Sequence, residues 1–174
     1  MDFWNETWKA EAVAKAAGLP KEKLQLWLGR NHVLGQGMGG GGEKGRHRRF
    51  EFRNVMEIAI ARALVDQGHR PADAFKAAAV FAYSAVQHPG TPGLPLDPVG
   101  GDTFMAVAGD KVTINYLPTG RGAMADFLAD LTGPEGNERD LEAFTMVNAS
   151  AVFRAVCREL TLDSSAILRE VKNQ

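Results

Sequence analysis

Apolar side chains recur every three to four residues in a short segment near the amino terminus, residues 21–28. Its apolar face is formed by Leu24, Trp27 and Leu28. The side chains that point away from this face are Lys21, Lys23 and Gln25. Residues 10–17 also favour a helix strongly, and Gly18-Leu19-Pro20 ends that helix and starts the next. The pattern predicts two short helices joined by a three-residue turn, which are the elements of a helix-turn-helix.

A glycine-rich tract, residues 35–42, follows the second helix and is too rich in glycine to hold a regular element. Val33 and Leu34 precede the tract, and the basic and aromatic run 46–50 follows it. We therefore expect the tract to be a mobile loop at the tip of a short hairpin. A hairpin in this place is the expected form of a wing.

Two further helices are predicted after the wing. Asn54 followed by Glu57 is typical of a helix cap, and an apolar stripe continues from there up to Gly68. The stripe consists of Met56, Ala59, Ile60, Ala63 and Leu64. Pro71 suits the first turn of another helix, which we expect to run to about Val86.

The second half of the chain has a different pattern. Four prolines interleaved with glycines between His88 and Gly101 exclude both helix and sheet. Beyond them, residues 103–108 and 111–117 flank Gly109-Asp110, and the second of these segments alternates like a half-buried strand, which predicts a hairpin. The further elements expected from spacing are a helix over 123–131, a strand over 143–147 and a helix over 151–160.

The elements combine into an α+β protein. The predicted parts are a mainly helical winged helix-turn-helix domain over 1–88, a Pro/Gly-rich linker over 89–102 and a small α+β domain over 103–174. We expect this last domain to serve dimerisation, sensing or protein interaction.

Charge divides the chain in the same way. Residues 1–70 hold 12 Lys and Arg against 8 Asp and Glu, a net of +4, whereas the remaining 104 residues hold 8 against 13, a net of −5. A basic first half joined to an acidic second half indicates that the first half faces a polyanion.

The basic residues of the first half gather beside the glycine-rich tract. Within ten residues the chain carries Lys44, Arg46, Arg48, Arg49 and Arg53. Beside a flexible loop, such side chains can reach phosphates on either side of a groove with little strain. Double-stranded DNA is therefore the expected partner, bound in a salt-dependent way.

Three stretches together resemble the mercury-resistance-type (MerR) transcriptional regulators. They are residues 10–28, the run His47-Arg48-Arg49-Phe50, and residues 63–71 from Ala63 to Pro71. The resemblance covers about 75 residues, and it implies a winged helix-turn-helix that binds promoter DNA as a homodimer. The DNA-contacting residues implied by the residue pattern and the resemblance together are Lys21, Lys23, Gln25, Arg30, Lys44, Arg46, His47, Arg48 and Arg49.

Two positions depart from the family pattern. Gln25 stands where the family has an arginine in the second helix, and His47 stands where it has a tyrosine in the wing. Both changes weaken the expected phosphate clamp. Gln25 can instead read a base edge, and His47 can still donate one hydrogen bond.

Catalytic and metal chemistry find no support in the motifs. The glycine run before Glu43-Lys44-Gly45 lacks the phosphate-binding-loop arrangement, and the four histidines have no zinc-site spacing. The single cysteine, Cys157, sits in an apolar helical stripe and is interpreted as a buried hydrophobe. We expect no enzyme activity, no cofactor and no metal. With no secretory or membrane-spanning pattern, we expect a cytoplasmic protein.

Two alternatives to a transcriptional regulator stay open. Phage excisionases share the winged-helix arrangement and bend DNA architecturally to direct recombination. In the other alternative the domain binds an acidic protein partner and touches no DNA. The sequence also leaves open an effector or protein partner for the C-terminal part.

Overall fold

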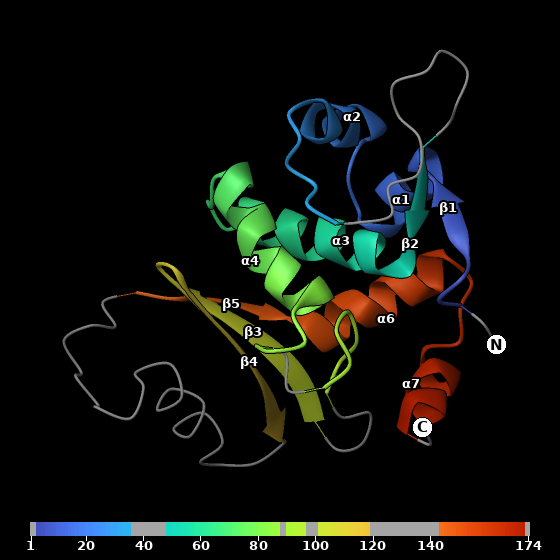
Figure 1. Cartoon of the computed structure of the whole chain (residues 1–174), viewed down its shortest axis with the longest axis vertical. Helices are drawn as coiled ribbons and strands as arrows, with labels where there is room; N and C mark the ends of the chain where they lie inside the picture. The colour runs from blue at the N-terminus through green and yellow to red at the C-terminus, as the bar shows by residue number, and fades with distance from the viewer. Residues whose placement is uncertain (1–2, 36–47, 88–89, 97–100, 119–142, 173–174) are drawn as a thin grey trace.

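A computed structural model describes residues 3–35, 48–87, 90–96, 101–118 and 143–172. The described helices are α1 (Ala10–Ala16), α2 (Lys21–Gly29), α3 (Phe52–Asp66), α4 (Pro71–Tyr83), α6 (Ala149–Glu159) and α7 (Ser164–Lys172). The described strands are β1 (Thr7–Lys9), β2 (Arg49–Glu51), β3 (Gly101–Ala108), β4 (Lys111–Pro118) and β5 (Thr145–Asn148). The predicted α+β class is confirmed. Helix α3 runs through the middle, with α2 above it and α6 and the larger sheet below it (Figure 1).

The predicted helix pair at the amino terminus is present. Helix α1 ends where Gly18 adopts a φ of 68°, and the Leu19 amide then donates to the Ala14 carbonyl at 2.9 Å. Pro20 follows as the cap of α2, since its fixed φ suits the residue before a helix. The buried face of α2 is the predicted one, Leu24, Trp27 and Leu28.

The predicted hairpin between residues 33–34 and 46–50 is wrong in its first arm. Strand β2 pairs with β1 in antiparallel register, with Trp8 opposite Phe50. Leu34 and Gly35 belong to no strand, because their amide groups donate to the side chain of Glu57 instead. The short amino-terminal strand was not predicted, and the glycine-rich tip itself, residues 36–42, lies outside the described residues.

Helices α3 and α4 correspond to the predicted pair with different ends. Helix α3 begins at Phe52 with Glu51 as its cap, so Asn54 is not the cap residue. The Oδ1 atom of Asn54 instead accepts the Glu51 amide from inside the first turn, at 2.9 Å. Helix α4 ends at Tyr83, before the expected Val86, which is 96% exposed.

The C-terminal half forms a three-stranded antiparallel sheet in the order β4-β3-β5. The predicted hairpin is confirmed: Ala108 pairs with Lys111, and Gly109 supplies the left-handed residue of the two-residue turn at a φ of 57°. The predicted third strand and the helix after it are also present, as β5 and α6. Helix α7 was not predicted, and the helix expected over 123–131 lies outside the described residues.

Buried residues form a core that continues from the first half of the chain into the second. Phe52 of α3 packs edge to face against Phe153 of α6, with ring centroids 5.9 Å apart. Leu94, inside the predicted linker, is buried, and the neighbouring Gly93 amide donates to the Phe81 carbonyl at 2.8 Å. The division into two domains stays a prediction. No helix among the described residues is long and apolar enough to span a membrane.

Candidate nucleic-acid interface

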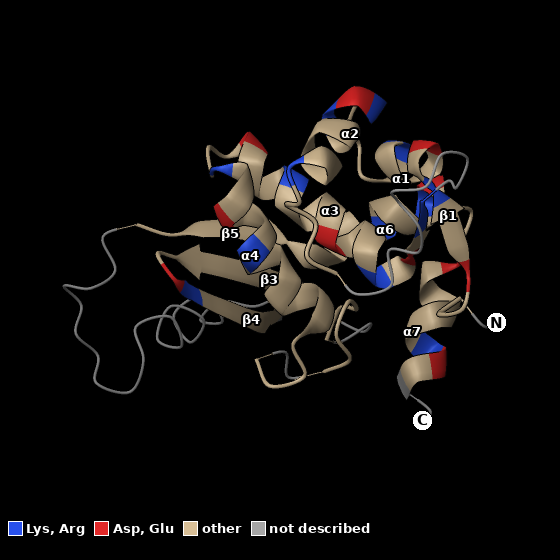
Figure 2. Cartoon of the chain, turned by 45° about the horizontal axis from the view of Figure 1, so that its top comes forward, with Lys and Arg blue, Asp and Glu red and all other residues tan. Residues whose placement is uncertain are grey.

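The exposed side of α2 carries three of the predicted DNA-contacting residues. Lys21 and Gln25 are exposed on the helix, and Arg30 is exposed at its C-terminal cap. Figure 2 shows both basic and acidic positions on α2, at the top of the view. Leu26, 49% exposed, lies among them. This side therefore offers two cations, an amide, an apolar group and the exposed carboxylate of Glu22 to a partner.

Lys23 is not part of that surface. Its ammonium lies 4.0 Å from the Asp66 carboxylate of α3 and 5.2 Å from the centre of the Trp27 ring. The opposite charge and the ring face both attract the cation toward the body of the protein. We therefore interpret Lys23 as a residue that fixes α2 on α3.

The β1–β2 ribbon brings a further cation to the candidate interface. Lys9 and Arg49 are directly opposite each other in the strand register, and both are exposed. Trp8 and Phe50 occupy the other face of the ribbon and pack inward. Sequence reasoning missed Lys9, because a three-residue strand has too few positions to show an alternation.

The position of Lys9 disfavours a positive charge for two reasons. Like charges directly opposite in a sheet repel each other. Lys9 is also the cap of α1, where the positive end of the helix dipole disfavours a cation. A polyanion laid against the ribbon would relieve both effects, so the pair has the character of a phosphate contact.

Arg48 and Arg49 are the only predicted wing cations among the described residues. Arg48 is half-buried and Arg49 is exposed. Lys44, Arg46 and His47 lie outside the described part of the chain. Arg53 faces another way, with its guanidinium 4.9 Å from the centre of the Trp4 ring.

A buried polar cluster lies between the end of α2 and the start of α3. The Glu57 carboxylate accepts the Leu34 amide at 2.6 Å, the Gly35 amide at 3.1 Å and the Tyr83 hydroxyl at 2.8 Å. The Nδ2 atom of Asn54 donates to the same hydroxyl at 2.8 Å. Because Asn54 also holds the Glu51 amide, the cluster connects Leu34 and Gly35 to the end of β2.

Burial decides the electrostatics of this cluster. The Glu57 side chain is fully buried, and desolvation raises the pKa of its carboxyl group above 4.5 although three hydrogen bonds favour the charged form. Desolvation and the neighbouring Glu57 also raise the pKa of Tyr83. A carbon atom added at Gly35 would collide with the Tyr83 hydroxyl and the Asn54 amide, so only glycine fits there. Sequence reasoning assigned Glu57 to a helix cap and missed this role.

Cys157 is buried in α6, and desolvation raises the pKa of its thiol to about 12, as expected for an unreactive cysteine. The described residues contain no cluster of three or more potential metal ligands. His69 is hydrogen-bonded to the Thr145 hydroxyl at 2.8 Å.

No protein-family model matches this sequence, and a search of curated proteins finds no match. The resemblance to the MerR-type regulators therefore stays an interpretation of the residue pattern. Any assignment of function depends on the geometry described above.

Proposed function

We propose that the protein is a DNA-binding transcriptional regulator of the winged helix-turn-helix type. Helix α2 enters the major groove, where Gln25 reads a base edge, and the β1–β2 ribbon with the basic segment beside it contacts the flanking backbone. The single observation that carries the proposal is the exposed Lys9–Arg49 pair, because two cations are held directly opposite each other, while Glu51, the carboxylate of the ribbon, stands opposite Thr7.

The arrangement of the elements supports the same proposal. Helix α2 and the β1–β2 ribbon lie toward one end of the molecule, and the three-stranded sheet lies toward the other (Figure 1). The polar cluster around Glu57 links the residues just after α2 to the end of β2 through buried hydrogen bonds. These hydrogen bonds fix the position of α2, the helix proposed to contact bases, relative to the β1–β2 ribbon, which is proposed to contact the DNA backbone. The proposal includes a homodimer on two half-sites, as for other helix-turn-helix regulators, and a cytoplasmic location with the DNA.

One observation favours a second candidate, a protein-binding module. Leu26 on α2 and Leu34 after it are 49% and 50% exposed, and an apolar pair of this kind suits a protein groove as well as a thymine methyl group. The two candidates differ in salt dependence, since phosphate contacts release counterions and apolar contacts do not.

The test is recovery of genomic fragments from the source organism by the purified protein at near-physiological salt, followed by sequencing. We expect a short inverted repeat located in promoters. Enrichment only at a recombination site would favour an excisionase-like function over transcriptional regulation. An absence of enrichment would overturn DNA binding and favour the protein-binding module.

A double variant tests the ribbon directly. Arg48→Ala with Arg49→Ala should weaken binding to every duplex and reduce the slope of log affinity against log salt by about 1.8, or about 0.9 for each lost phosphate contact. Gln25→Ala should instead relax the preference at one base pair by about 1–3 kcal/mol. The matched control is Lys111→Ala with Arg169→Ala, which removes two exposed cations from β4 and α7. An unchanged slope in the first variant would refute the ribbon assignment.

A further inference from the structure

A cleft of about 550 Å³ opens between α4 and the β3–β4 hairpin, outside the candidate DNA interface. Its apolar lining is formed by Ala77, Val80, Val107 and Val112. Five polar or charged side chains line the rest: His69, Arg70, Asp73, Lys76 and Asp110. An apolar surface with a few convergent polar groups and a volume in this range is typical of a small-molecule site.

Three of the polar side chains already have partners. His69 is held by the Thr145 hydroxyl, and the Arg70 guanidinium donates to the Asp73 carboxylate at 2.9 Å. These pairs leave little charge for a ligand to neutralise. The two pairs lie at the end of the cleft where α4 begins, and they fix the side chains there.

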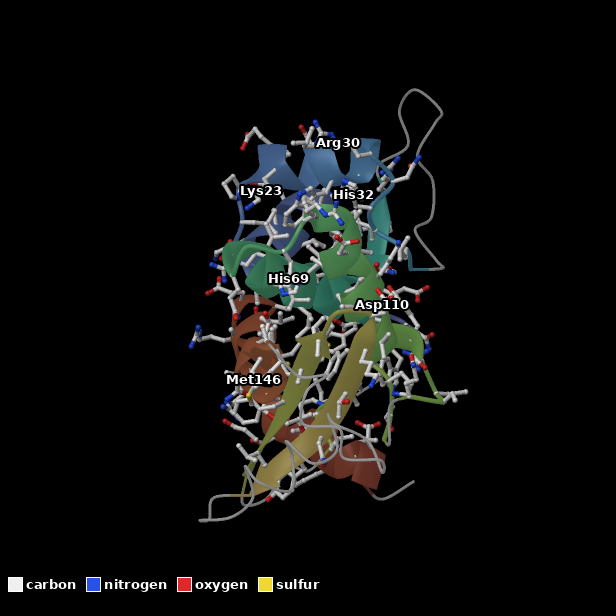
Figure 3. The ribbon with its side chains drawn as sticks, turned by 90° about the vertical axis from the view of Figure 1, so that its left-hand side faces the viewer. Lys23, Arg30, His32, His69, Asp110 and Met146 are labelled. Atoms are coloured by element: carbon white, nitrogen blue, oxygen red, sulfur yellow. The ribbon has the colours of Figure 1, made fainter. Side chains whose placement is uncertain are left out.

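Lys76 and Asp110 are different. Among the residues that the structure describes, neither side chain has a hydrogen bond or an ion pair. Lys76 lies on α4, one turn before Val80, and Asp110 lies in the turn of the hairpin, so the two charges come from separate segments that line the same cleft. Asp110 and His69 lie on the side of the molecule that faces the viewer in Figure 3.

We propose that this cleft binds a small zwitterion with an apolar body, that is, a free apolar amino acid. Its carboxylate pairs with the Lys76 ammonium, its ammonium group pairs with the Asp110 carboxylate, and its side chain covers the valines of the lining. Charge-assisted hydrogen bonds at both ends supply orientation, and burial of the apolar body supplies the rest of the affinity.

The cleft is also placed to influence α2. Phe75, on the buried side of α4, packs against Trp27 with ring centroids 5.2 Å apart and stacks on His32 at 6.1 Å. A ligand that bridges α4 and the hairpin favours one position of α4, and Phe75 transmits that position to α2. The amino acid therefore acts as an effector of DNA binding, an extension that rests on the proposed function.

Binding is tested by amide NMR on the full chain without DNA. The probes are L-valine, L-leucine, L-phenylalanine and L-tryptophan at millimolar concentration, with 3-phenylpropanoate and 2-phenylethylamine as phenylalanine analogues that each lack one charge. We expect at least one amino acid to shift the amides of residues 76–80 and 107–112. Each analogue should bind about tenfold more weakly than phenylalanine, the loss of one charge-assisted hydrogen bond.

Variants assign the two charges. Lys76→Met and Asp110→Asn should each weaken amino-acid binding about tenfold, and Asn is well suited to a hairpin turn. Lys111→Met, next in the chain but not part of the lining, is the control and should bind as the wild type does. No shift with any amino acid, equal binding of the singly charged analogues, or shifts elsewhere in the chain would overturn the proposal.

DNA affinity is then measured with and without the bound amino acid. A change of fivefold or more is expected for a coupling free energy of the usual size. An unchanged DNA affinity would overturn the effector role and leave the binding site standing. Failure to bind DNA both with and without the amino acid would instead count against the proposed function, so the two failures are distinguishable.

Discussion

Replacing Lys9 by glutamine should change DNA affinity and protein stability in opposite directions. Lys9 is opposite Arg49 on the exposed face of the ribbon and is also the cap residue of α1. Glutamine is one atom shorter than lysine, keeps a polar end and removes the charge. The substitution therefore tests whether the ribbon keeps an unfavourable cation for the sake of a polyanionic partner.

The expected changes in stability and DNA affinity follow from the two surroundings of Lys9, opposite Arg49 and at the start of α1. Like charges opposite in a sheet and a cation at a helix start each cost a few tenths to about 1 kcal/mol, and screening at this exposed site favours the lower end. The Lys9→Gln protein should thus gain a few tenths of a kcal/mol in free energy of unfolding. Loss of one phosphate contact should reduce the salt slope by about 0.9 and, at about 0.1 M salt, weaken DNA binding by up to about eightfold.

Two measurements on the same preparations decide the outcome. Urea unfolding at low salt gives the free energy, and fluorescence anisotropy with a labelled duplex at several salt concentrations gives the slope. Lys111→Gln, an exposed lysine on the C-terminal hairpin, is the control and should leave the slope unchanged. A Lys9→Gln protein that binds DNA like the wild type, with the same slope, would refute the role of the Lys9–Arg49 pair.

Two further predictions concern the cluster around Glu57. Gly35→Ala should lower the free energy of unfolding by about 1–3 kcal/mol, because the added methyl group collides with Tyr83 and Asn54, and Gly29→Ala is the matched control because its added carbon meets no atom; equal stability of the two variants in urea would contradict the close approach at Gly35. Glu57→Gln replaces one acceptor oxygen by an NH2 group and should lose a hydrogen bond, but its stability relative to the wild type should improve as the pH rises above 4.5. The raised pKa of Glu57 means that its contribution to stability is fully present below that value and is lost as the carboxyl group ionises. Urea titrations of both proteins from pH 4 upward measure the difference, and a difference that moves the other way would show that the three hydrogen bonds outweigh desolvation.

Periodicity made several elements predictable. Helix α2 shows its buried face because Leu24, Trp27 and Leu28 are close in sequence and all contact the core. The β3–β4 hairpin is visible for a similar reason, since a two-residue turn at Gly109 joins two alternating segments. In both cases the interactions that define the element are local, so the residues themselves contain the signal.

The elements that sequence reasoning missed depend on distant partners. Strand β1 has three residues and exists because β2, far along the chain, pairs with it. The direction of Lys23 depends on Asp66, and the burial of Glu57 depends on the amides that follow α2. A charged residue in a helical pattern is usually solvated, so nothing local distinguishes Glu57 from an ordinary surface carboxylate.

The contact between Phe52 and Phe153 has a consequence for synthesis of the protein. The ring of Phe52 stands at the start of α3, close to the β1–β2 ribbon, and part of its cover is provided by Phe153 of α6, a helix far along the chain. A nascent chain that stops before α6 therefore exposes the part of α3 that α6 covers. We expect nascent chains that stop before α6 to be substrates for chaperones and proteases.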